Sequence, residues 1–581
     1  MRATYFEAPF RPILALAFAL MAQPALAQTA AELATQRAAY DEVRTKTILE
    51  LQPFRQETQA LMPDSETPLR LVSLNPGINA WFLVEIGEGR RQQSYHIENP
   101  DPRGQSLALA PGPALVISGA EGEAHCEPWA GEPSELTAAR DSGLPYAPLC
   151  ESRLYLRNPV TGSRTSLERT TDFLRDHVWG GEGVVRFIRE NFYRDLGLET
   201  SDQLATGGRV PEAGPPPAPL RVPDGERPVI STMHDFELDG ADSGRMTVGV
   251  WYPVTALRGI YVSAIQPRQI AGEILDGPGR TNPLDSVERG ATDYMVAFDL
   301  SRFDLGFALG TDHPRLDWSP RPPGSVRPRG LPGPDGVGSP DPLVPLGMVS
   351  PTLTGRTVAT FTAGFKRQHG AFKWGPFSTI NYGSHYGFIE QGVILSKLQP
   401  GLSTLYVLDD GTIEMKSWTE ADNVLLPRIR FARQNGVPLV EPHPETGEPV
   451  PGELVTNWGP GNWSGSAQVE LRTLRAGGCM IPAGDTRYLV YGYFTAATPS
   501  VMARTFIAYG CKYAMLLDMN ALEHTYLALY VRGGSALHVE HLQPGMALID
   551  KKDRQGNVIP RFLGYPDNRD LFYLMLKEDA P

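Results

Sequence analysis

The chain reads TPSVMARTFIAYGCKYAMLLD from Thr498 to Asp518 and then MNALEHTY to Tyr526. Thr498 is suited to cap a helix and Pro499 to open it, while Gly510 is suited to end it. The apolar residues after the glycine predict a strand that delivers Asp518 at its carboxyl end, where open α/β sheets place their chemistry. Asp is also a common turn former, so this pattern alone leaves a functional Asp518 and a turn-forming Asp518 equally open.

Several shorter segments lie upstream in a defined order. They read ATFTAGF at 359–365, GFIEQG at 387–392, TLYVLDDGT at 404–412, and RAGG at 475–478 followed by YLVYG at 488–492. Together with the segment that ends in Asp518, they resemble the phosphodiester glycosidase family, the N-acetylglucosamine-phosphodiester glycosidase-like domains, over roughly residues 245–545. In that family the last strand enters Asp-Gly-Gly-Gly-Ser, of which Asp518 survives. An earlier strand enters Asn-Gly-Gly-Phe-Phe, where Thr362 takes the place of the Asn.

The resemblance implies an α+β or mixed α/β fold. A C-terminal mixed sheet with helices is expected, preceded by a smaller β-rich domain with helices. Pro- and Gly-rich stretches suggest where the chain divides. The expected divisions are a signal peptide at 1–27, an N-terminal domain at 28–200, a linker at 201–228, and a glycosidase-like domain at 229–581 with a Pro- and Gly-rich insertion at 312–345.

The resemblance also implies hydrolysis of a sugar linkage. Such a reaction takes one carboxyl group to protonate the leaving oxygen and a second group as the nucleophile or as the activator of water. We expect Asp518 to be the first catalytic residue and Glu523 the second. The residues expected to bind substrate are Asn520, His524, Thr362 and Glu390.

The departures from the family pattern leave three interpretations open. Met519, Asn520 and Ala521 stand where the family has glycines, whose backbone N–H groups can approach a substrate closely. The site then binds a smaller or differently shaped ligand, or the side chains of Asn520, Glu523 and His524 replace the backbone groups, or the activity has been lost.

The sequence therefore predicts an exported glycosidase-like protein that hydrolyses a sugar or sugar-phosphodiester linkage on an extracytoplasmic glycan. The alternative is a non-catalytic module on a degenerate glycosidase fold, which binds envelope glycan or a protein partner. No cofactor is expected, and the signatures of serine hydrolases, P-loop proteins and zinc proteases do not occur in the sequence. The segment HVEH at 538–541 suggests a metal site, but in a strand His538 and His541 point to opposite faces, so we expect none.

The amino terminus predicts export. Arg2 and Arg11 precede an apolar stretch at 13–22, and Pro-Ala-Leu-Ala at 24–27 provides a small-x-small cleavage site, so cleavage is expected after Ala27. The apolar stretch is too short to span a membrane, and no other stretch approaches about 18 apolar residues. A periplasmic or secreted protein without a membrane span is therefore expected.

Four cysteines fit an oxidising compartment. Cys126 and Cys150 lie in the first half of the chain and Cys479 and Cys511 in the second, so disulfides within each half are expected among the three possible connectivities. The formal net charge of −13 over 581 residues argues against a nucleic-acid partner, because such binding depends on neutralising phosphates with Lys and Arg.

Overall fold

The computed structural model describes residues 47–62, 65–165, 205–206, 227–242, 244–314, 324, 339–366, 371–372, 387–456, 472–484, 486–533 and 536–578. The expected signal peptide, the Pro-rich centre of the linker and most of the expected insertion at 312–345 lie outside these residues. The proposed domain boundaries therefore stay predictions.

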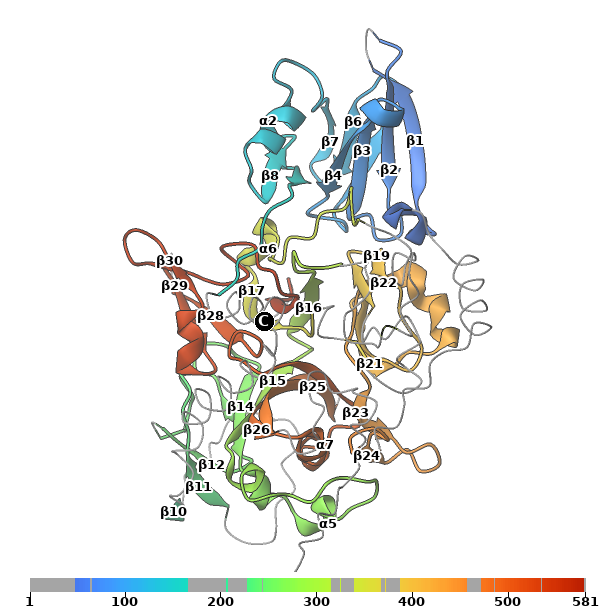
Figure 1. Ribbon diagram of the computed structural model, residues 1–581. Helices are drawn as coiled ribbons and strands as arrows, with labels where there is room; N and C mark the ends of the chain where they lie inside the picture. The colour runs from blue at the N-terminus through green and yellow to red at the C-terminus, as the bar shows by residue number, and fades with distance from the viewer. Residues whose placement is uncertain are drawn as a thin grey trace, which may run out of the picture.

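Strands dominate the described residues, and the expected α+β or mixed α/β class is wrong (Figure 1). The fold is mostly β, and its large sheets pair antiparallel. The described α-helices are short, and α7 (Pro499–Ala508) is the longest of them. The expected helix and strand around Gly510 are confirmed, since α7 is followed by β27 (Ala514–Met519).

Among its described residues, the N-terminal domain, at the top of Figure 1, holds two antiparallel sheets and one short α-helix. The first sheet has the order β1 (Gln56–Leu61), β2 (Pro68–Ser73), β3 (Trp81–Ile86), β4 (Gln93–Glu98), β9 (Leu154–Arg157), β8 (Tyr146–Leu149). The second comprises β5 (Gln105–Leu109), β6 (Leu115–Gly119) and β7 (Gly122–Cys126). The other elements are η1 (Ile48–Leu51), η2 (Gly89–Arg91) and α2 (Glu135–Asp141).

Three further sheets of five or more strands form the body of the molecule among the described residues. The eight-stranded sheet has the order β13 (Tyr252–Pro253), β14 (Ile260–Ile265), β15 (Asp293–Asp299), β26 (Thr486–Ala497), β25 (Thr473–Ala483), β27, β23 (Pro438–Pro442), β24 (Pro449–Pro451). One five-stranded sheet has the order β16 (Phe303–Ala308), β32 (Leu571–Leu576), β17 (Thr357–Thr362), β28 (Leu527–Gly533), β29 (Ala536–His541). The other has the order β19 (Val393–Ser396), β18 (Phe388–Glu390), β22 (Ile429–Gln434), β20 (Ser403–Leu408), β21 (Ile413–Ser417).

Smaller elements surround these sheets. The strands are β10 (Ala205–Thr206), β11 (Pro228–Ser231), β12 (Arg245–Thr247), β30 (Lys551–Lys552) and β31 (Val558–Ile559). The helices are η3 (Pro267–Gln269), α5 (Gly272–Leu275), η4 (Glu288–Gly290), α6 (Pro351–Thr354), η8 (Glu420–Arg428) and η9 (Pro544–Leu548). No helix among the described residues is long and apolar enough to cross a membrane.

Sheets rather than helices cover the buried faces, which explains why the fold class differs from the expectation. Every residue of β17 is buried. The ring of Phe361 on this strand lies 6.4 Å from Phe298 of β15, 5.2 Å from Tyr491 of β26 and 5.5 Å from Phe572 of β32. Aromatic side chains of this size fill the space between two packed sheets, so no layer of helices is needed there.

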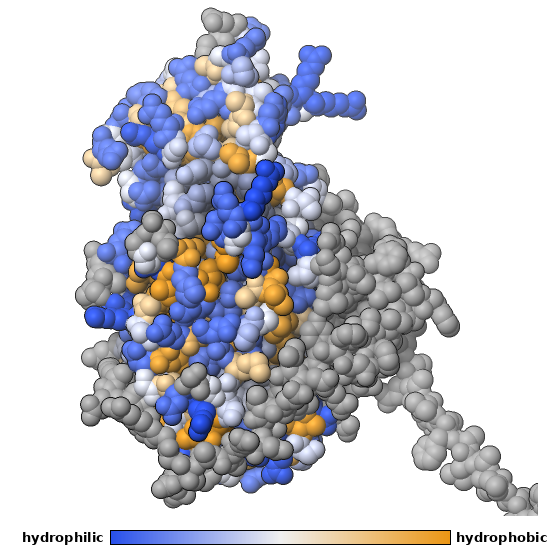
Figure 2. All heavy atoms as spheres, turned by 90° about the vertical axis from the view of Figure 1, so that its left-hand side faces the viewer, coloured by the Kyte–Doolittle hydropathy of each residue, from blue (hydrophilic) through white to orange (hydrophobic). Residues whose placement is uncertain are grey.

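The N-terminal domain has a hydrophobic cluster of its own, and part of the domain also packs into the core of the body. Ile48, Trp81 and Leu83 belong to the same hydrophobic cluster as the large sheets. The amide of Gln52 donates a 2.6 Å hydrogen bond to the carbonyl of Ile394 and accepts one of 2.8 Å from its N–H. In Figure 2 this domain forms an upper lobe that continues into the larger body. The boundary therefore contains buried apolar and polar contacts.

Both expected disulfides are present. Cys126 is bonded to Cys150, and Cys479 on β25 is bonded to Cys511 in the turn between α7 and β27. The second bond joins neighbouring parts of the unit that ends in Asp518, and both of its cysteines are fully buried. Two disulfides are compatible with an exported protein.

Replacing Cys479 and Cys511 together by Ala is expected to lower the free energy of unfolding by about 3 kcal/mol, because the bond closes a 32-residue separation in the unfolded chain. Urea denaturation of oxidised wild type and of the double variant measures the difference. Dithiothreitol serves as the control, since it should weaken the wild type more than the variant. Equal midpoints for oxidised wild type and the variant would show that this bond adds nothing to stability.

Candidate active site

A bulge in β27 determines where Asp518 points. Arg475 of β25 pairs with Met519 and Gly477 pairs with Leu516, so four residues of β27 face three residues of β25. An extra residue of this kind bends a strand and redirects its side chains, and such bulges often lie next to active sites. The carboxylate of Asp518 is thereby directed toward the segment just before β32, where its partners lie.

Arg569 is the main partner of Asp518. Its Nη1 lies 2.5 Å from Oδ2 of Asp518, and the second carboxylate oxygen accepts a 2.8 Å hydrogen bond from the N–H of Met519. Both side chains are almost fully buried. Of the two readings that the sequence pattern left open for Asp518, turn former or functional residue, neither includes this buried ion pair with a distant segment.

His524 contacts the same arginine. Its Nδ1 lies 2.8 Å from the carbonyl of Met519, and its Nε2 lies 2.5 Å from Nη2 of Arg569. A carbonyl only accepts and a guanidinium only donates, so these contacts fit a neutral imidazole with its proton on Nδ1. His524 is half-buried, whereas Asp518 is only 3% exposed, so His524 is the more accessible of the two.

A second buried pair lies beside the first. Arg433 of β22 places Nη2 2.9 Å from Oδ2 of Asp570, and Nδ1 of His313 lies 2.6 Å from the other carboxylate oxygen. Burial opposes ionisation of Asp570, but His313 and Arg433 together outweigh it and hold the pKa of Asp570 below its ordinary value. Burial lowers the pKa of His313 despite the carboxylate, which favours the neutral form of its imidazole.

Lys366 adds a third cation. Its Nζ lies 3.0 Å from Oδ2 of Asp312, and Arg164 lies 2.5 Å from the other oxygen of this carboxylate. Three distant parts of the chain meet in this contact, since Arg164 belongs to the N-terminal domain, Asp312 follows β16 and Lys366 follows β17. Asp312 marks the start of the expected insertion at 312–345, so that end of the insertion lies near the Asp518 site.

Burial controls the ionisation of Asp518. It raises the pKa of this carboxyl to about 6, although Arg569, Arg433 and Lys366 each favour the charged form. A carboxyl group with a pKa near the working pH is suited to donate or accept a proton. The geometry therefore provides a titratable acid within a cluster of cationic side chains.

Thr362 lies where the sequence comparison expects it. It ends β17, and its hydroxyl donates a 2.5 Å hydrogen bond to the backbone carbonyl of His524. β17 pairs with both β28 and β32, so it connects the segment after Asp518 with the segment that carries Arg569. Because the hydroxyl bonds to the backbone carbonyl of His524, Thr362 helps to fix the position of the segment that follows Asp518.

Glu523 and Asn520 follow Asp518 in the chain and contact other segments. The carboxylate of Glu523 accepts a 3.4 Å hydrogen bond from the hydroxyl of Thr165, and its backbone carbonyl accepts one of 2.7 Å from Arg561. Asn520 accepts a 3.1 Å hydrogen bond from the hydroxyl of Thr473. Its φ of 83° lies in the left-handed region, which Asn tolerates better than most residues and which a glycine would occupy without strain.

Glu390 belongs to a different cluster. Its carboxylate lies 3.4 Å from Arg157 of the N-terminal domain and accepts a 2.9 Å hydrogen bond from the N–H of Leu309. Burial raises the pKa of Glu390 to about 7 although Arg157 favours the charged form, and the neighbouring carboxylate of Glu98, which lies 2.5 Å from Arg157, adds to the rise. None of the contacts described for Glu390 is with Asp518.

Several residues that complete the site are not among those expected from the sequence. Asp567, Asn568, Arg569 and Asp570 are consecutive and buried, and they lie beyond the end of the recognised resemblance. The available signal was a run of charged residues directly before the apolar strand LFYLML at 571–576, since charges at such a position need buried partners. Nothing in the sequence singles out Arg433 as a site residue, because it lies within an ordinary strand pattern, that of β22.

Two sets of possible metal ligands lie among the described residues, one at 538–541 and one beside the Cys126–Cys150 disulfide. His541 is buried and lies 3.1 Å from Asp550, whereas His538 is exposed. Cys126, Cys150 and Glu135 lie close enough together to hold an ion, but the two cysteines are bonded to each other. A disulfide sulfur is not a thiolate ligand.

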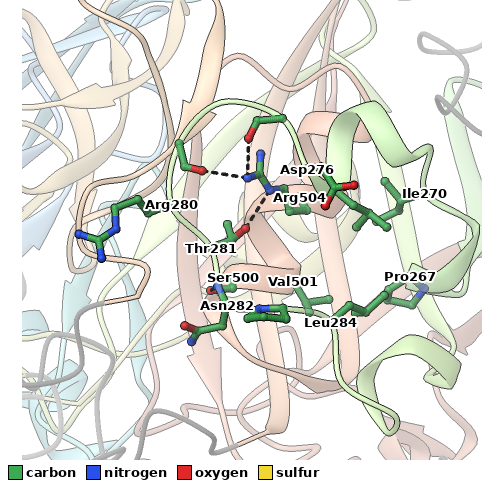
Figure 3. Close-up of a pocket in the computed structure, with 14 residues that line it drawn as sticks. Pro267, Ile270, Asp276, Arg280, Thr281, Asn282, Leu284, Ser500, Val501 and Arg504 are labelled. Carbon is green, nitrogen blue, oxygen red and sulfur yellow. Dashed lines mark hydrogen bonds between the residues drawn. The ribbon is translucent and has the colours of Figure 1, made fainter.

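A separate cavity of about 460 Å³ lies beside the start of α7 (Figure 3). Arg504 reaches from α7 into the loop at 277–281, where it donates hydrogen bonds to three backbone carbonyls and to the hydroxyl of Thr281. The arginine thus holds the loop against the helix. None of the residues expected from the sequence to act in catalysis or substrate binding lines this cavity.

No protein-family model matches the chain, and a search of curated proteins finds no match. Among solved structures, the zebrafish N-acetylglucosamine-1-phosphodiester alpha-N-acetylglucosaminidase catalytic domain, auto-inhibited by its pro-peptide, is 11% identical, covering 56% of this chain and 85% of that chain, with a TM-score of 0.27. A putative exported protein from Burkholderia pseudomallei K96243 is 12% identical, covering 49% and 74%, with a TM-score of 0.18. Both similarities are distant, and neither defines the family or the function of this chain.

Proposed function

We propose that the Asp518 cluster is the active site of an exported hydrolase that cleaves a sugar–phosphodiester linkage on an extracytoplasmic glycan. The observation that carries the proposal is the convergence of a titratable carboxyl group with Arg569, Arg433 and Lys366. Arginine and lysine are the side chains that bind phosphate oxygens best. Asp518 is the proposed general acid.

The charges in this cluster suit an anionic substrate. When Asp518 is protonated, the cations Arg569, Arg433, Lys366 and Arg164 face the carboxylates of Asp570 and Asp312. This leaves a surplus of positive charge, which a phosphodiester would neutralise. The protonated state of Asp518 and the binding of an anion therefore favour each other.

In the proposed reaction, the bond between the anomeric carbon and the phosphate oxygen breaks. Asp518 gives its proton to the departing phosphate oxygen, and water supplies the hydroxyl group to the sugar while its remaining proton returns to the enzyme. Glu523 is retained as the proposed second carboxyl group, and its contact with Thr165 must then open when substrate binds. His524 is proposed to orient Arg569 toward the substrate.

One observation favours a second function, a non-catalytic glycan-binding module. Both oxygens of Asp518 already have partners, and the side chain is only 3% exposed. Structural ion-pair networks also perturb pKa values, so a closed ion pair of this kind is equally suited to a site without catalytic activity.

The test compares two substrates that differ only in the leaving group. The purified protein is incubated with a synthetic N-acetylglucosamine phosphodiester and with the nitrophenyl glycoside of the same sugar. The proposal expects release of sugar from the phosphodiester, slower release from the neutral glycoside, and competitive inhibition by inorganic phosphate. Binding of the phosphodiester by calorimetry without any release of sugar would reject the hydrolase and support the binding module.

A further inference from the structure

Arg157 extends from the N-terminal domain into the body of the molecule. It ends β9, and its side chain is only 1% exposed. Its Nη1 lies 2.5 Å from Glu98, its Nη2 lies 3.4 Å from Glu390, and its Nε donates a 3.0 Å hydrogen bond to the carbonyl of Val344. The guanidinium also lies 4.3 Å from the ring of Trp81. These contacts fix the side chain on every side, and two of them, to Glu390 and Val344, lie outside the N-terminal domain.

Glu390 connects Arg157 to the end of β16. Its second carboxylate oxygen accepts a 2.9 Å hydrogen bond from the N–H of Leu309. The N–H of the next residue, Gly310, donates a 3.0 Å hydrogen bond to Asp570. Two successive backbone N–H groups thus bind two carboxylates, one in the Arg157 cluster and one in the Asp518 cluster.

Gly310 also packs directly against the backbone that carries Arg569. A Cβ atom at this position would lie 2.4 Å from the carbonyl carbon of Arg569 and 2.5 Å from the carbonyl oxygen of Asn568. Such distances are shorter than van der Waals contact, so only glycine allows this approach. A shift of residues 309–310 would therefore move Arg569, which holds Asp518.

We propose that Arg157 is a positioning residue for the Asp518 site. Through Glu390 and the backbone of residues 309–310, it fixes the segment at 568–570 that holds Asp518 and Arg433. The N-terminal domain is then part of the active site's support and not a separate accessory module. This inference rests on the proposed function of the Asp518 site for its kinetic consequence, whereas its structural consequence is independent of that function.

The test uses the full chain with Arg157→Met, Arg157→Lys and Arg140→Met. Arg140 is the matched control, because it lies on α2 of the same domain and is 47% exposed. Hydrogen exchange is followed by mass spectrometry in peptides that cover 303–312 and 563–572. Arg157→Met is expected to speed exchange there about tenfold relative to peptides from α7, since local opening depends on local contacts. Arg157→Lys should restore part of the protection, and Arg140→Met should change nothing.

The kinetic readout separates positioning from general loss of stability. With the phosphodiester substrate, Arg157→Met should lower kcat/KM about tenfold, the size of a typical coupling through a packed network. It should also move the alkaline limb of the pH profile to higher pH, because a displaced Arg569 no longer favours ionised Asp518. Loss of folded protein alone lowers the rate without moving this limb.

Unchanged exchange at 303–312 and 563–572 in Arg157→Met would overturn the inference, as would equal acceleration in the α7 peptides. If the wild type releases no sugar, the proposed function fails. The exchange experiment then still decides whether Arg157 positions the segment at 568–570.

Discussion

Replacing Asp518 by Asn is expected to lower the rate of sugar release by about 100-fold or more, since general acid catalysis contributes rate factors of that order. Asn has nearly the same shape, and it can still accept the hydrogen bond from the N–H of Met519. It cannot donate an acidic proton to a leaving oxygen. The measurement is kcat/KM on the synthetic phosphodiester for wild type and variant at several pH values.

Asp550→Asn provides a matched control for this prediction. Asp550 is also buried, and it is bound to Tyr526 and His541 in a cluster that contains none of the proposed catalytic groups. A small loss of rate in this control and a large one in Asp518→Asn assign the effect to the site. Equal rates for wild type and Asp518→Asn would exclude Asp518 as the general acid.

The same variant also changes how stability depends on pH. The pKa of Asp518 is raised in the folded protein to about 6, so the folded state binds this proton more tightly than the unfolded state. The resulting stabilisation is fully present below the unfolded pKa and is lost as the pH rises through about 6. Asp518→Asn has no carboxyl group to titrate, so it does not lose this stabilisation. The stability of the variant relative to wild type should therefore be higher at pH 7 than at pH 4. The upper limit of the gain is on the order of 3 kcal/mol, and urea denaturation at both pH values measures it.

The local parts of the site were predictable because local residues specify them. Thr498, Pro499 and Gly510 bound a single helix, and the apolar run behind them forms β27 as expected. The strand that ends in Thr362 was predictable for the same reason. In each case the pattern of a few neighbouring residues is enough to predict the local secondary structure without knowledge of the tertiary contacts.

The partners of Asp518 were not predictable, because sheet topology brings them together. β32 enters the sheet between β16 and β17, and this places Arg569 from the end of the chain beside Asp518. No spacing in the sequence encodes that insertion. Glu390 shows the same limit, since its backbone lies in β18 while its side chain contacts Arg157 in the other domain.

Removing the buried charge of Arg433 is expected to destabilise the protein by about 3–5 kcal/mol, the usual cost of leaving a buried partner charge uncompensated. Arg433 is fully buried, donates a 2.9 Å hydrogen bond to the carbonyl of Phe365 and holds Asp570 at 2.9 Å. The comparison is between Arg433→Met and Arg487→Met, measured by urea denaturation. Arg487 pairs with Glu414 at 2.8 Å, but both side chains are about two-fifths exposed, so its loss should cost less than about 1 kcal/mol.

The loss in Arg433→Met should also depend on pH, with a sign that identifies its cause. Arg433 normally lowers the pKa of His313, which lies 2.6 Å from the same carboxylate. Without the arginine, His313 is freer to take up a proton and to compensate Asp570. If the pKa of His313 is higher in the variant than in the wild type, the variant gains stability relative to the wild type at low pH. This gain is lost as the pH rises through the pKa of His313. Arg433→Met should therefore be less destabilised at pH 5.5 than at pH 8, and adding Asp570→Asn should remove this difference. Two results would contradict this prediction: equal destabilisation of Arg433→Met at both pH values, or a loss no larger than that of Arg487→Met. Either result would show that removing Arg433 does not leave an uncompensated charge on Asp570 in the core.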